Sequence, residues 1–98
     1  MFVTEAHLDN NWTSLASIIG GTIEEDVLYT ITNSSQTDRL YAVESSGTPA
    51  QGIQGIPFDP EAFLRYVKGD QDLYLRNGAT VSTNGSARKS RITIHKKG

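Results

Sequence analysis

The chain has 98 residues, of which 37% are hydrophobic and 20% charged, and it contains no cysteine. This length fits one domain over residues 1–98 and is too short for two independent cores. The missing cysteines exclude disulfides, thiolate metal sites and cysteine nucleophiles. The N-terminus, MFVTEAHLDNNW, has no basic region and no apolar run, and no stretch approaches the roughly 20 apolar residues that span a bilayer. We therefore expect neither a signal peptide nor a membrane partner.

The net charge of −2 conceals a strong asymmetry along the chain. Residues 1–49 hold seven acidic residues and one basic residue, for a charge of −6, and residues 50–98 hold eight basic and four acidic residues, for +4. A cluster of basic residues would suit phosphates. The pI of about 5.5 argues against nucleic acid, because nucleic-acid-binding domains usually have a pI above about 9. Two interpretations stay open: head-to-tail contact between oppositely charged edges, or two differently charged, solvated strands.

Short segments of alternating hydrophobicity, separated by Gly, Asn, Ser, Asp and Pro, predict an all-β protein. No stretch has sustained helical periodicity. We expect a compact antiparallel β-sandwich or small barrel of about seven or eight short strands. The strong strand candidates are Val27–Thr32, Arg39–Glu44, Ala62–Lys68, Asp72–Arg76 and Arg91–His95, and the weaker ones are Phe2–Thr4, Thr13–Ile19 and Ala79–Thr83.

The connections contain clear turn signals. Asn77-Gly78 is the strongest hairpin signal, because both central residues of a type I′ turn need a positive φ. Asp59-Pro60 could start one helical turn, but the alternation after it favours a strand. Residues 45–57 form the longest unpatterned stretch, and residues 1–11 and 95–98 are predicted to be an N-terminal arm and a flexible basic tail.

The sequence contains no recognisable catalytic constellation, so we expect no enzyme, no cofactor and no metal. His7 and His95 stand near opposite ends of the chain, without metal-type spacing. Asp70-Gln71-Asp72 resembles the start of a calcium loop, but the strand pattern that follows favours a turn. Tyrosines inside predicted strands are more often core residues than a stacking surface.

Six residues are candidates for a protein interface. Trp12 lies in a polar segment, as a plug at one end of the sandwich or as an interface anchor. The other five form the basic C-terminal cluster: Arg88, Lys89, Arg91, Lys96 and Lys97.

Residues 23–75 resemble small structural proteins of tailed bacteriophage particles. The likeness runs through VLYTITNSS, RLYAVESSGTP, GIPFDP and GDQDLYLRN, and it is one of rhythm and composition. The resemblance implies a non-enzymatic virion protein, made in the host cytoplasm, that decorates or cements the capsid by binding the major capsid protein or other virion proteins. It also implies a homo-oligomer or many copies on a lattice. A tail, fibre or head–tail joining component and a carbohydrate-binding β-sandwich are the alternatives.

Overall fold

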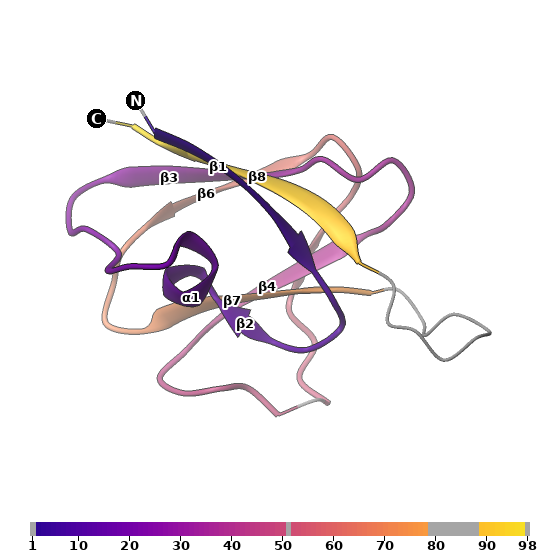
Figure 1. The fold of residues 1–98 in the computed structure, drawn as a ribbon. Coiled ribbons are helices and arrows are strands. Elements are labelled where there is room, and N and C mark those ends of the chain that lie inside the picture. Colours follow the sequence, from indigo (N-terminus) through magenta and orange to yellow (C-terminus); the bar gives the residue numbers. More distant parts are fainter. Residues whose placement is uncertain (1, 51, 79–88, 98) are drawn as a thin grey trace.

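The structure, a computed structural model, describes residues 2–50, 52–78 and 89–97. Within these ranges the chain forms two four-stranded antiparallel sheets, in the orders β1-β8-β3-β6 and β2-β7-β4-β5 (Figure 1). This confirms the predicted all-β fold and identifies it as a β-sandwich. The strands are β1 (Phe2–Leu8), β2 (Thr13–Ser14), β3 (Leu28–Asn33), β4 (Leu40–Ser45), β5 (Ile56–Phe58), β6 (Phe63–Val67), β7 (Asp72–Asn77) and β8 (Ser90–Lys96), and the helix is α1 (Leu15–Ile19).

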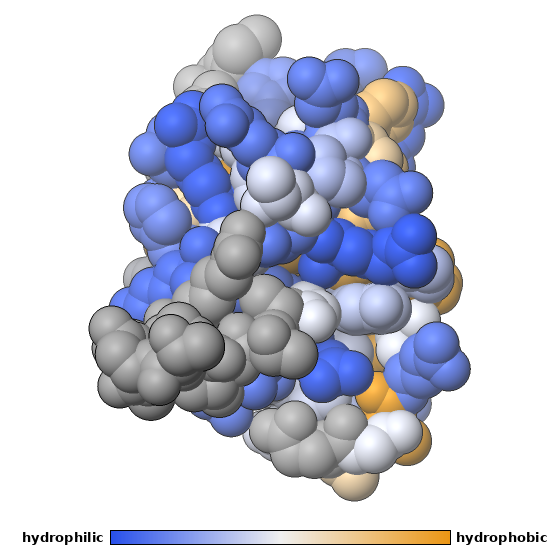
Figure 2. All heavy atoms as spheres, turned by 90° about the vertical axis from the view of Figure 1, so that its right-hand side faces the viewer, coloured by the Kyte–Doolittle hydropathy of each residue, from blue (hydrophilic) through white to orange (hydrophobic). Residues whose placement is uncertain are grey.

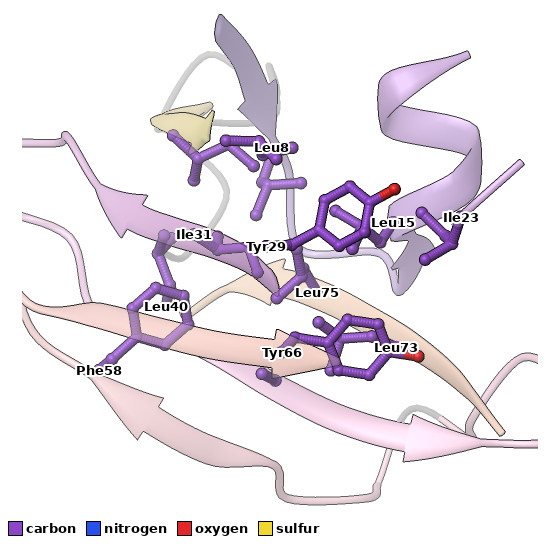
Figure 3. Close-up of a cluster of buried hydrophobic side chains, with 13 residues drawn as sticks. Leu8, Leu15, Ile23, Tyr29, Ile31, Leu40, Phe58, Tyr66, Leu73 and Leu75 are labelled. Atoms are coloured by element: carbon purple, nitrogen blue, oxygen red, sulfur yellow. The ribbon is translucent and has the colours of Figure 1, made fainter. Parts of the chain in front are cut away.

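The core lies between the two sheets, where alternate residues of the strong strands meet (Figure 3). Tyr29 and Ile31 of β3, Leu40 of β4, and Ile92 and Ile94 of β8 are almost completely buried, as the period-2 pattern predicts. The hydroxyl of Tyr29 accepts a hydrogen bond from the backbone N–H of Glu24. The phenol of Tyr66 donates to the carbonyl of Gln71, and burial raises the pKa of Tyr66.

Both chain ends differ from the expected arm and tail. The segment predicted to be an N-terminal arm contains β1, which pairs with β8 from Phe2↔Lys96 to Leu8↔Ser90. At the other end, β8 continues to Lys96, and the backbone N–H of Lys97 donates to the carbonyl of Leu28. Long antiparallel pairing therefore holds both ends in the first sheet.

The segment predicted as a weak strand over residues 13–19 is mainly a helix. The side chain of Ser14 caps this helix by accepting from the N–H of Ser17 at 3.2 Å. Gly20 ends it with a φ of +73°, and its N–H donates to the carbonyls of Ala16 and Ser17. Because the helix has only five residues, it is too short to show a periodic sequence signal.

Other connections also correct the sequence-based expectations. The unpatterned stretch 45–57 contains most of β5, which pairs with β4 from Leu40↔Phe58 to Ala42↔Ile56. Asp59-Pro60 starts a turn and not a helix, with Glu61 at a φ of +71°. Asp70 and Gln71 form the bend before β7, in line with the turn interpretation. The type I′ turn expected at Asn77-Gly78 is not formed, because Asn77 is the last residue of β7 and neither residue has a positive φ. Residues 79–83, the expected second strand of that hairpin, lie outside the described residues.

A polar network joins the two sheets at one end of the sandwich. Asn77 is fully buried, and its Nδ2 donates to the carbonyl of Leu8 at 2.9 Å and to Oγ of Ser90 at 3.1 Å. Ser90 in turn donates to Oδ2 of Asp38 at 2.6 Å. Asn33, also fully buried, donates to the carbonyls of Asp38 and Phe58. These bonds tie the β3–β4 loop to both sheets.

Candidate protein interface

Trp12 packs against its own chain and is only 7% exposed. Its indole N–H donates to the carbonyl of Ala50 at 3.2 Å, in the loop after β4. The guanidinium carbon of Arg76, on β7, lies 4.9 Å from the centre of the indole ring. The structure therefore favours the packing interpretation of Trp12 over the interface anchor.

The basic cluster separates into two groups, because a strand extends it in space. Lys89 and Arg91 lie at the start of β8 and Lys96 and Lys97 at its end, so the two groups are about 16 Å apart at about 3.3 Å per residue. Arg88 lies outside the described residues. The basic candidates therefore form no single continuous patch within the described part of β8.

Acidic residues from the first half of the chain already pair with this strand. Nε of Arg91 lies 3.4 Å from a carboxylate oxygen of Glu5, on the neighbouring β1. Lys96 forms an ion pair with Glu24, and this partner raises the pKa of Lys96. Exposed ion pairs of this kind stabilise a fold little, by about 0–1 kcal/mol. They do reduce the charge that the strand offers to another molecule.

The two histidines do not meet. His7 of β1 opposes Arg91, whereas His95 of β8 opposes Val3 and Thr30. Four strand positions, about 13 Å, separate the two sites along β1. Together with Lys89 and Arg91, His7 lines a hollow of about 350 Å³ beside the polar loop of residues 34–38.

The large hydrophobic side chains that are exposed among the described residues lie on β5, on β6 and in the loop before β5. We call these four side chains the apolar edge: Ile53 (44% exposed), Ile56 (64%), Phe63 (55%) and Val67 (50%). Figure 2 shows hydrophobic residues along one side of an otherwise largely hydrophilic face. Single exposed apolar residues are common on protein surfaces, whereas a contiguous exposed apolar patch often marks an interaction site.

The apolar edge adjoins two strands with unpaired margins. β6 ends the first sheet and β5 ends the second, so each pairs with one neighbour only among the described strands. A groove of about 70 Å³ between them is lined by Ile56, Leu64 and Tyr66, together with residues of β4 and β7. Edge strands of this kind offer free backbone donors and acceptors to a partner.

The alternation in the sequence of β6 places Phe63 and Val67 on one face of the strand and Leu64 and Tyr66 on the other, and in the structure the first two are exposed and the other two are more buried. The alternation alone could not tell which face is exposed, because both faces of this strand contain large apolar side chains. The guanidinium of Arg65, between the two exposed residues, lies 5.4 Å from the centre of the Phe63 ring. This charged residue within an apolar strand is the one sequence signal for the outward face.

Neither a metal centre nor a membrane-spanning helix is found in the described ranges. No group of three or more His, Asp or Glu side chains there is arranged to hold a metal ion. No helix there is long and apolar enough to cross a membrane. Comparison with protein-family models, curated proteins and solved structures finds no match for the chain.

Proposed function

We propose that this protein is a non-enzymatic structural component of a tailed bacteriophage virion, most simply a capsid decoration protein. It binds the shell by protein–protein contact through the apolar edge. The observation that carries this proposal is the exposure of four large hydrophobic side chains beside two edge strands. The resemblance of residues 23–75 to virion proteins is the reason for proposing a phage capsid as the partner.

The size of the apolar edge suits a weak contact that is repeated many times. Complete burial of one such side chain contributes about 1.5–3 kcal/mol. Since these four are about half exposed already, their burial against a partner contributes about 1 kcal/mol each, or about 4 kcal/mol in all. A contact of that strength does not hold one copy at low concentration, but avidity between linked copies does. This supports a homo-oligomer or many copies on a lattice.

The structure bears differently on the two alternative functions, carbohydrate binding and another position in the virion. A carbohydrate-binding module would use Trp12 and the strand tyrosines. Trp12, Tyr29, Tyr66 and Tyr74 are at most 9% exposed, and the half-buried ring of Tyr41 contacts the guanidinium of Arg76. A sugar-stacking platform needs an exposed aromatic face, so the burial of these rings weighs against that alternative. A tail, fibre or head–tail joining role uses the same kind of surface, and the number of copies per particle distinguishes it.

The proposal is tested by mass photometry and sedimentation of the purified protein, alone and with purified tailed-phage shells. We expect an oligomer, or saturable binding in hundreds of copies per shell. The double variant Phe63→Ser/Val67→Ser should reduce occupancy at least tenfold, since about 2 kcal/mol of contact is lost. The control Gln36→Ser changes an exposed loop residue away from β5 and β6 and should bind like the parent protein.

A second arm of the experiment tests an electrostatic contact. The double variant Lys89→Ser/Arg91→Ser and a salt titration measure how much the basic end of β8 contributes to binding. Full occupancy by the Phe63/Val67 variant would contradict the role of the apolar edge. A monomer that ignores shells would contradict the decoration role.

A further inference from the structure

Arg76 stands between two aromatic rings on the outer face of the second sheet. Its guanidinium carbon lies 4.9 Å from the centre of the Trp12 ring and 5.5 Å from that of Tyr41. The register explains this arrangement, because Tyr41 of β4 pairs with Arg76 of β7 and Trp12 immediately precedes Thr13, which pairs with Leu75. Cation–π contacts on both sides fix the guanidinium plane.

Close packing holds both rings in place. A Cβ on Gly78 would lie 2.5 Å from Cε2 of Tyr41, and a Cβ on Gly55 would lie 3.0 Å from Cη2 of Trp12. Real Cβ atoms essentially never come as close as 2.5 Å, so a side chain at position 78 would have to displace the ring of Tyr41. The site around Arg76 is therefore preorganised.

Among the described residues, Arg76 forms no ion pair with a carboxylate, whereas Arg39 pairs with Asp59, Arg91 with Glu5 and Lys96 with Glu24. Nε of Arg76 is buried and has no hydrogen-bond partner among the described residues. A buried donor without a partner costs about 1–3 kcal/mol and calls for an explanation. Because Nε itself is covered, a ligand in the adjoining pocket reaches the guanidinium through its terminal nitrogens.

A pocket of about 370 Å³ opens at this residue. Arg76 is the one charged residue among the described residues that line it, and Asn10 and Gln54 add carboxamides. A planar guanidinium beside amide donors matches the two oxygens of a carboxylate. A single cation also suits a singly charged ligand better than a phosphate dianion.

We propose that the Arg76 pocket binds the carboxylate of an acidic peptide side chain. The faces that a sugar ring would stack on are covered, since Trp12 is 7% exposed and Arg76 lies between the two rings, so an acidic peptide fits better than an acidic sugar. The inference rests on the pocket alone and does not depend on the virion role.

The single tryptophan of the chain reports on this pocket directly. The full-length protein is titrated with the blocked tripeptide acetyl-Ala-Glu-Ala-amide while Trp12 fluorescence is followed, and acetyl-Ala-Gln-Ala-amide serves as the neutral control. We expect a saturable change with the glutamate peptide only. Arg76→Lys keeps the charge but loses the planar fork, and should weaken binding about tenfold, whereas Arg76→Gln should abolish it.

Two further measurements keep the test decisive. Far-UV circular dichroism confirms that each variant is folded, and Lys97→Gln removes one positive charge at the far end of β8 without touching the pocket. Lys97→Gln should bind like the parent protein. The proposal is overturned if the parent protein does not respond to the glutamate peptide, or if Arg76→Gln binds normally. It is also overturned if inorganic phosphate or N-acetylneuraminic acid binds through Arg76 and the peptide does not.

Discussion

Asn33 offers the sharpest test of what holds the sandwich together. This residue is the last of β3, fully buried, and its side chain makes four hydrogen bonds. Nδ2 donates to the carbonyls of Asp38 at 2.7 Å and Phe58 at 3.1 Å, and Oδ1 accepts from the N–H of Ser35 at 3.0 Å and from its hydroxyl at 2.7 Å. Asn33→Ala removes all four, of which the bond to Phe58 is buried and the other three are partly buried.

The expected loss follows from this geometry. At about 1 kcal/mol net for each hydrogen bond, Asn33→Ala should lower the free energy of unfolding by about 4 kcal/mol. That is a large share of the roughly 5–15 kcal/mol typical of a domain. Urea unfolding, followed by Trp12 fluorescence and circular dichroism, measures the loss, and an unchanged m value shows that both proteins unfold in the same way.

Two further variants at and near this position separate hydrogen bonding from other effects. Asn33→Asp keeps the size and the acceptor but turns a carboxylate oxygen toward the two carbonyls. The folded state then favours the protonated acid, so the penalty should grow as the pH rises above about 3.9. Gln36→Ala removes an exposed carboxamide from the same loop and should change stability by less than about 0.5 kcal/mol. A loss below about 1 kcal/mol for Asn33→Ala would refute the reasoning.

Three more predictions concern the hydrophobic core, the contact between Gly78 and the ring of Tyr41, and the stability of the fold at alkaline pH. Ile94→Ala, at a fully buried site, should cost about 2–5 kcal/mol in urea unfolding, and a smaller loss would mean that the core collapses around the gap. Gly78→Ala should displace the ring of Tyr41 and change Trp12 fluorescence, and an unchanged spectrum would contradict the tight contact. Burial raises the pKa of Tyr66 above 10.0, so the folded state resists ionisation that the unfolded state allows, and stability should fall as the pH rises above 10. Tyr66→Phe should flatten that fall, and an unchanged slope would contradict the assignment.

Sequence reasoning located the elements whose two faces differ strongly. In β3 the apolar residues Tyr29 and Ile31 alternate with threonines, and these two apolar residues are the buried ones. β5 was missed because it has three residues and includes Pro57. β1 was underestimated because Glu5 and His7 alternate with small or weakly apolar residues, so that long pairing with β8, rather than hydrophobicity, defines this strand.

The candidate site was harder to predict, because it depends on which strands become edges. Pro57 suits an edge strand, but β5 itself was not predicted, and the sequence of β6 does not indicate that this strand ends its sheet. The placement of Arg76 between Trp12 and Tyr41 depends on strand register in the same way, because these three residues meet only when β2, β7 and β4 are aligned. In the sequence, Asn33 looks like the first residue of a polar loop. Its burial could not be predicted, because it depends on partners distant in the sequence such as Phe58.

In the folded state, part of the charge asymmetry of the chain is taken up by ion pairs within the molecule. The ion pairs Arg91–Glu5 and Lys96–Glu24 join basic residues of the second half of the sequence to acidic residues of the first half, whereas Arg39–Asp59 joins the halves in the opposite sense. Some of the opposite charges that suggested head-to-tail contact between copies are thus paired within one molecule. Since salt screens exposed charges but hardly affects apolar burial, a contact made through the apolar edge should persist at high ionic strength. The salt titration of shell binding therefore discriminates between the two surfaces more directly than any single substitution in the basic cluster.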